Sequence, residues 1–172
     1  MDIQDQTTLL ASQVKGIILD VDGVLTNGQI NYSDSGEEIK SFHVQDGASI
    51  KLLQNHQIEV AIISGRTSPA VTRRAQELGI KYVQQGAQSK SQALDELLEA
   101  GFCKNNLCAI GDDLADLELY ARQNVTLKVT VANGHPAVQA RADFITQRKG
   151  GEGVIVELAQ LILKAQGRWN FE

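Results

Sequence analysis

Cysteine is scarce in this sequence, and the two that occur, Cys103 and Cys108, lie close together in a chain of 172 residues. There is no second cysteine pair, and the three histidines show no metal-binding spacing. Neither a disulfide framework nor a structural zinc site is therefore indicated. We expect both cysteines to be ordinary reduced thiols, with Cys108 inside a strand.

Long apolar runs and an excess of basic residues are missing as well. No stretch approaches the ~18 consecutive apolar residues of a membrane-spanning helix. The first residues, MDIQDQTTLLASQ, begin acidic and lack the apolar segment of a signal peptide. A formal net charge of -5 provides no positive field that would attract nucleic acid. We therefore expect a cytoplasmic protein that binds neither membranes nor nucleic acid.

What the sequence does contain is a regular alternation of short apolar runs and amphipathic segments. Its length suits one domain over residues 1–172. Strands that alternate with helices predict an α/β fold: a Rossmann-like, doubly wound, largely parallel sheet with helices on both faces. The predicted strands are 16–21, 58–64, 81–86, 106–111, 125–132 and 143–146, and the predicted helices are 46–56, 69–78, 90–100, 114–122 and 154–166.

Residue patterns typical of helix starts support two of these predicted helices. One segment breaks the alternation of strands and helices. Ser68 followed by Pro69 predicts a helix start, and Ser89 with Gln92 three positions later has the pattern of a capping box. The segment GQINYSDSGEEIKSFHV, residues 28–44, instead indicates two short strands around the turn SDSG. We expect a β-hairpin flap that follows the first strand directly and projects above the sheet.

Aspartates gather where two predicted strands end. Asp20 and Asp22 are two positions apart, so both side chains can face one site, and Asp112, Asp113 and Asp116 follow the strand 106–111. Each cluster alone has an equally good structural explanation, because acids are common in turns before glycine and at helix N-termini. Together they would repel unless a cation lay between them. Oxygen ligands without histidine or cysteine favour Mg²⁺.

Two further polar residues stand at neighbouring strand ends, Ser64 and Lys90. Acids, Mg²⁺, a lysine and a serine hydroxyl are the groups that phosphoryl transfer uses. Ser64 by itself could be a turn residue, and Lys90 could be a solvated residue in the first turn of a helix. A cation is unfavourable at that end of a helix, however, unless an anion is near it.

Four stretches resemble the motifs of the haloacid dehalogenase superfamily of aspartate-nucleophile phosphatases. They are LDVDGVLT (19–26), IISGR (62–66), QSKSQ (88–92) and IGDDLAD (110–116), and they span most of the chain in the family's order and spacing. The resemblance implies that Asp20 is the nucleophile that becomes an aspartyl phosphate. It also implies that Asp22 is first the general acid for the leaving alcohol and then the base for water.

The same resemblance implies the metal and substrate ligands. Mg²⁺ would be held by the Asp20 carboxylate, the Asp22 backbone carbonyl and the Asp112 carboxylate, with Asp113 or Asp116 in support. Ser64 and Lys90 would hold the phosphoryl group. The expected substrate-binding residues are Ser64, Gly65, Arg66, Lys90 and Asp46.

The spacing of the motifs leaves no room for a separate cap domain. The capless branch that the chain resembles consists of homotetramers that act on a phosphorylated sugar acid in lipopolysaccharide synthesis. We therefore expect neighbouring subunits to cover the site. Nonulosonate 9-phosphate phosphatases share the four motifs, and Gln45 and Glu152 stand where the family pattern has basic residues. The exact sugar phosphate stays open.

Two other classes of function fit part of the pattern. A phosphorelay receiver also combines aspartates, a hydroxyl residue, a lysine and Mg²⁺ on a parallel sheet. Receivers, however, place the phosphoacceptor at a central strand's end and lack the hairpin. A catalytically silent subunit that only supports an oligomer is weakly disfavoured, because the full set of chemical groups is present.

Overall fold

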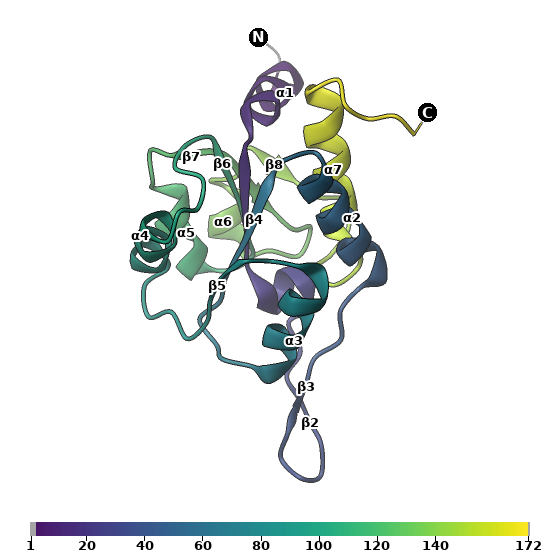
Figure 1. Ribbon diagram of the computed structural model, residues 1–172, viewed down its shortest axis with the longest axis vertical. Helices are drawn as coiled ribbons and strands as arrows, with labels where there is room; N and C mark the ends of the chain where they lie inside the picture. Colours follow the sequence, from purple (N-terminus) through teal and green to yellow (C-terminus); the bar gives the residue numbers. More distant parts are fainter. Residues whose placement is uncertain (1–2, 172) are drawn as a thin grey trace.

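The computed structural model describes residues 3–171, and its centre is one parallel sheet (Figure 1). The strand order is β5-β4-β1-β6-β7-β8, and every neighbouring pair is parallel. This confirms the predicted doubly wound sheet. The strands are β1 (Gly16–Leu19), β4 (Glu59–Ile63), β5 (Tyr82–Gln84), β6 (Leu107–Gly111), β7 (Val125–Thr130) and β8 (Phe144–Ile145).

Helices cover both faces of the sheet (Figure 1). One face carries α1 (Ile3–Gln13), α2 (Val44–Asn55), α3 (Pro69–Leu78) and α7 (Val154–Ala165). The other carries α4 (Lys90–Glu99), α5 (Leu117–Tyr120) and α6 (Pro136–Gln139). No helix within residues 3–171 is long and apolar enough to cross a membrane.

Two hydrophobic cores follow from the alternation of side chains along the strands. In β1, Ile17 and Leu19 belong to the core under α2 and α7, whereas Ile18 belongs to the core under α4. A strand buried on both faces has no polar face, which explains its continuous apolar run. Leu19 is in register with Ile62 of β4 and Ile110 of β6, so all three strands end at nearly the same level.

A tight turn and a hairpin follow β1. The irregular π-type turn η1 (Val21–Leu25) contains Gly23 at φ +96°. The strands β2 (Asn31–Tyr32) and β3 (Glu38–Ile39) then pair antiparallel and extend away from the sheet (Figure 1). The side chains of Tyr32 and Ile39 on this hairpin are largely exposed.

The structure corrects several local predictions. Helix α1 was not predicted because its sequence, IQDQTTLLASQ, has only a weak apolar stripe, and the four-residue helix α6 was not predicted either. The predicted helix 114–122 is a 3₁₀ turn, η2 (Leu114–Asp116), followed by α5. Ser68 occupies the N-cap position of α3, but its hydroxyl makes no capping bond.

The predicted capping box of α4 forms only in half. The Ser89 hydroxyl accepts a hydrogen bond from the Gln92 backbone N–H at 3.2 Å. The Gln92 side chain turns instead to Glu96, at 3.4 Å. A complete capping box forms elsewhere, between Asp113 and Asp116 of η2.

Candidate active site

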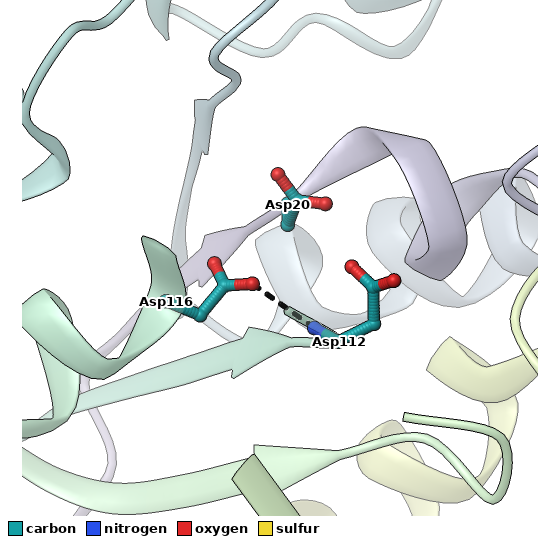
Figure 2. Close-up of side chains that lie close together, drawn as sticks. All are labelled: Asp20, Asp112 and Asp116. Atoms are coloured by element: carbon teal, nitrogen blue, oxygen red, sulfur yellow. Dashed lines mark hydrogen bonds between the residues drawn. The ribbon is translucent and has the colours of Figure 1, made fainter. Parts of the chain in front are cut away.

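Three aspartates from two neighbouring strand ends face a common space at the carboxyl edge of the sheet (Figure 2). Asp20 directly follows β1, and Asp112 directly follows β6. Asp116 comes from η2, which begins two residues after Asp112. Carboxylate oxygens of the three residues lie within 4.8 Å of one another.

Lys90, the first residue of α4, joins two of these acids. Its ammonium nitrogen lies 2.6 Å from Oδ1 of Asp20 and 2.5 Å from Oδ1 of Asp116. All three side chains are less than 10% exposed. Although burial opposes it, the Asp20 and Asp116 carboxylates raise the pKa of Lys90, so the side chain stays charged. The anions explain how a lysine is stable at a helix N-terminus.

Asp116 is oriented by the loop in which it lies. Its Oδ2 accepts hydrogen bonds from the backbone N–H groups of Asp112 at 3.0 Å and Asp113 at 3.1 Å (Figure 2 shows the first). Its other oxygen is thereby free to meet Lys90. Gly111 permits this packing, because a Cβ there would lie 2.0 Å from Cγ of Asp116.

The donor set fits a hard divalent cation. When ionised, three carboxylates and one ammonium sum to two negative charges (-3 + 1 = -2) in a site shielded from water. Oxygen ligands at this spacing suit Mg²⁺. Asp20 and Asp112 are the residues that would hold it, with Asp116 in support. The Asp113 carboxylate accepts from the backbone N–H of Leu114 at 2.7 Å and is absent from the three-acid group.

Gly23 makes room for Asp112. Its φ of +96° is a conformation that side-chain-bearing residues rarely adopt. A Cβ at this position would lie 2.1 Å from Oδ2 of Asp112. Glycine is therefore required at this position for two reasons: the backbone has a positive φ, and the Asp112 carboxylate leaves no space for a Cβ.

Burial and like charge set the protonation of the acids. Burial raises the pKa of Asp20 to about 8, with Lys90 opposing the shift and Asp116 and Asp112 adding to it. Burial, followed by the charge of Asp116, also raises the pKa of Asp112 to about 6. Both shifts express, first, the cost of burying a carboxylate and, second, its repulsion by the neighbouring acids.

Asp22 stands apart from this group and contacts the hairpin. Its Oδ1 accepts a hydrogen bond from the ammonium of Lys40, which follows β3. The same ammonium lies 2.7 Å from Oε1 of Glu38, and Oε2 of Glu38 lies 3.3 Å from Nη2 of Arg66. Sequence reasoning missed Lys40, because an isolated lysine after a polar hairpin carries no signal of burial.

The loop after β4 contains the expected phosphate-binding residues. Ser64 is 2% exposed, and its hydroxyl accepts from the Arg66 backbone N–H at 3.3 Å. Gly65 lies between them, where a Cβ would meet only ordinary contacts. Arg66 extends toward Glu38.

Asp46 lies on α2 and is 3% exposed. Its Oδ1 accepts from the Ile155 backbone N–H at 2.8 Å, so this carboxylate caps the N-terminus of α7. Burial raises the pKa of Asp46 to about 6, and the hydrogen bond to Ile155 opposes the shift. In the structure Asp46 therefore caps a helix, whereas the sequence predicted that it binds substrate.

A glycine-rich loop, residues 148–153, closes over the turn after β1. The Gly151 N–H donates to the Val24 carbonyl at 2.9 Å. A Cβ on Gly150 would lie 1.7 Å from the Gly23 carbonyl oxygen, so only glycine fits at this contact. The loop thus supports the backbone that carries Asp20 and Asp22.

The raised pKa of Asp20 predicts that the protein without divalent cations loses stability as the pH rises. The folded-state pKa of about 8 lies above the ordinary 3.8, so the folded state binds the extra proton between these values. This contribution is present below about pH 4 and is lost as the pH rises through about 8. Between about pH 6 and pH 9, Tm in EDTA should fall by about 5–11 °C more for the wild type than for Asp20→Asn. Mg²⁺ should reverse the difference, and parallel Tm curves for the two proteins would contradict the assignment.

Comparison with known proteins places the chain in a family. A model described as haloacid dehalogenase-like hydrolase matches residues 83–158. The 3-deoxy-D-manno-octulosonate 8-phosphate phosphatase KdsC of Escherichia coli K12 is 42% identical over 159 residues, 92% of this chain and 84% of the relative. The crystal structure of the Yersinia pestis phosphatase of the same name has a TM-score of 0.90 at 40% identity, covering 95% of this chain and 88% of that one.

A second crystal structure shows a relative with ligands. The 3-deoxy-D-manno-octulosonate 8-phosphate phosphatase of Moraxella catarrhalis, in complex with magnesium, phosphate and KDO, has a TM-score of 0.88 at 40% identity. The match covers 95% of this chain and 93% of that one. The chain belongs to the haloacid dehalogenase-like hydrolases, in the family of the 3-deoxy-D-manno-octulosonate 8-phosphate phosphatases.

Proposed function

We propose that this chain is a Mg²⁺-dependent phosphoric monoester hydrolase that converts 3-deoxy-D-manno-octulosonate 8-phosphate to the free sugar acid and phosphate. One observation carries the proposal: a buried carboxylate at the end of β1, Asp20, is held by Lys90 inside a three-acid group. This is the arrangement that phosphoryl transfer through an aspartyl phosphate requires. Relatives at about 40% identity are named as phosphatases of this sugar phosphate, and we assign the chain to lipopolysaccharide sugar synthesis.

The reaction uses two aspartates in two steps. One oxygen of Asp20 attacks phosphorus, and the bond between phosphorus and the sugar oxygen breaks as Asp22 gives that oxygen a proton. Asp22 then accepts a proton from water, whose oxygen attacks the phosphorus of the aspartyl phosphate. Inorganic phosphate leaves, and the Asp20 carboxylate and the proton on Asp22 are both restored.

The groups around Asp20 bind the phosphoryl group and neutralise its negative charge. Lys90 keeps Asp20 oriented through the 2.6 Å contact and adds positive charge near the phosphoryl oxygens. Ser64 and the backbone of Gly65 lie on the loop after β4, where they bind the same oxygens. When bound by Asp20, Asp112 and the Asp22 carbonyl, Mg²⁺ supplies charge neutralisation for the phosphoryl group.

We propose that the chain is a single domain without a separate cap. The hairpin β2–β3 is the one long projection beside the site within residues 3–171 (Figure 1). Its exposed apolar side chains are Ile30, Tyr32 and Ile39. We propose that they pack against neighbouring subunits of a homotetramer, with the hairpins and C-terminal segments of neighbours covering each site.

The setting of the reaction follows from the same proposal. Both cysteines are unpaired, which fits a reducing compartment, and we propose that the enzyme works in the cytoplasm. The net charge of the chain is negative, so it does not favour nucleic acid, and we propose that local basic groups, Arg66 and Lys90 among them, hold the anionic substrate. The nonulosonate 9-phosphates are the second substrate class, because Gln45 and Glu152 replace expected basic residues.

Substrate identity is tested by phosphate release with Mg²⁺ across 3-deoxy-D-manno-octulosonate 8-phosphate, nonulosonate 9-phosphates and hexose phosphates. The octulosonate should have the highest kcat/KM. Asp20→Asn should lower kcat by at least about 10³-fold on every substrate, because no nucleophile remains. Asp5→Asn, in the exposed first turn of α1, is the control and should keep wild-type rates. A higher kcat/KM for a nonulosonate would overturn the sugar assignment, and turnover by Asp20→Asn would overturn the nucleophile.

Substitutions that introduce charges on the hairpin test the proposed homotetramer. Tyr32→Asp combined with Ile39→Asp should shift the light-scattering mass from a tetramer to smaller species and lower kcat/KM by about 10-fold, because a charge in an apolar interface is costly. Lys104→Asp, on an exposed loop, should leave both values unchanged. A wild-type monomer with full activity would refute the tetramer.

A further inference from the structure

Lys40 is a buried lysine whose position the reaction described so far does not explain. Its side chain is only 2% exposed, although it follows a short hairpin whose strands are largely open to solvent. Lysine is almost never buried unless its charge is paired. The segment after β3 returns from the hairpin toward the sheet (Figure 1). The Lys40 ammonium thereby reaches the Asp22 carboxylate in the turn after β1.

The partners of Lys40 are two carboxylates. The ammonium donates to Oδ1 of Asp22 and lies 2.7 Å from Oε1 of Glu38. The other oxygen of Glu38 is bound by Arg66, which comes from the loop after β4. These contacts form a chain that joins the turn after β1, the hairpin and the loop after β4.

The Asp22 carboxylate has no comparable second support. Within residues 3–171, the Lys40 ammonium makes the one hydrogen bond to this carboxylate. Asp22 is 24% exposed, so without that bond its side chain would turn freely among rotamers. Asp20 and Asp116, in contrast, are each fixed by Lys90.

We propose that Lys40 is a positioning residue that holds the general acid and base Asp22 in its working orientation. The inference rests on the role assigned to Asp22 under the proposed function. Lys40 donates to Oδ1, so the transferable proton of Asp22 resides on Oδ2, which is free to face the leaving oxygen. The proton passes from Oδ2 to the sugar oxygen as the bond from phosphorus to that oxygen breaks, and Lys40 keeps its own protons throughout.

The hairpin gains a second role from this contact. Because Lys40 follows β3 directly, displacement of the hairpin would withdraw the ammonium from Asp22. Glu38 and Arg66 hold the lysine between them and oppose that movement. The element that we propose to cover a neighbouring site therefore also organises the site of its own chain.

The test compares leaving groups, because a mispositioned acid matters only where the leaving oxygen needs a proton. Lys40→Met preserves the length and apolar stem of the side chain but removes the ammonium. On the alkyl phosphate that the wild type hydrolyses best, kcat/KM should fall by about 10- to 100-fold, part of the range for general acid catalysis. On 4-nitrophenyl phosphate, whose leaving group departs without a proton, the loss should stay below about 3-fold.

Three variants complete the design. Asp22→Asn should show the same dependence on the leaving group with a larger loss. Lys40→Arg keeps a donor and should recover at least part of the activity on the alkyl phosphate. Lys104→Met, on an exposed loop, should match the wild type on both substrates. Tm measurements establish that each variant is folded before rates are compared.

The outcomes separate this inference from the substrate assignment. Equal losses of kcat/KM on both substrates, or no loss on either, would overturn the role of Lys40. If Lys40→Met is unfolded, failure of folded Lys40→Arg to retain more alkyl phosphate activity than Asp22→Asn would overturn it as well. A wild type that prefers another alkyl phosphate would overturn only the proposed sugar, because the comparison is then made on that preferred substrate.

Discussion

The contact of the Lys90 ammonium with Asp20 and Asp116 is the constraint around which this site is arranged. Charges shielded from water lose their hydration, and a buried ion pair of this kind seldom adds stability over well-packed apolar residues. Its value is therefore chemical. It keeps the Asp20 carboxylate, the proposed nucleophile, at the end of a central strand, beside Asp112, in a group whose excess negative charge favours a cation. The raised pKa values of Asp20 and Asp112 are the electrostatic expression of that demand.

The fold brings the acids together because glycine backbone segments approach their side chains closely. Strands β1 and β6 end at the same level, so Asp20 and Asp112 emerge side by side. Glycines then remove the atoms that would keep the acids apart: Gly23 makes space for Asp112, and Gly111 makes space for Asp116. Gly150 lets the glycine-rich loop rest on the Gly23 carbonyl. The apolar cores supply rigidity on both sides of β1, and the polar site lies at the carboxyl edge of the sheet.

Much of this arrangement could be predicted from local patterns, and the remainder depends on contacts between distant segments. The alternation of apolar runs and amphipathic segments predicted the parallel sheet, because buried strands and surface helices have different periods. Helix α1 escaped prediction because tertiary packing, and not its own pattern, stabilises it. The sequence left Asp113 and Asp116 as alternatives, and only the fold places Asp116 beside Lys90 while Asp113 caps η2. Burial of Lys40 depends on how a hairpin folds back, which no local pattern encodes.

The central claim is that Asp20 carries the phosphoryl group, and covalent trapping tests it most directly. The Asp22→Asn variant lacks the proposed base for water and would be mixed with Mg²⁺ and 4-nitrophenyl phosphate, whose leaving group departs without a proton. The mixture would be quenched in acid and reduced with borohydride, which converts an acyl phosphate to an alcohol. Mass spectrometry of the peptides should then find Asp20 reduced to homoserine, and no other aspartate changed. Modification at Asp112 or Asp116 in place of Asp20, or continued phosphate release with no modified aspartate, would contradict the account.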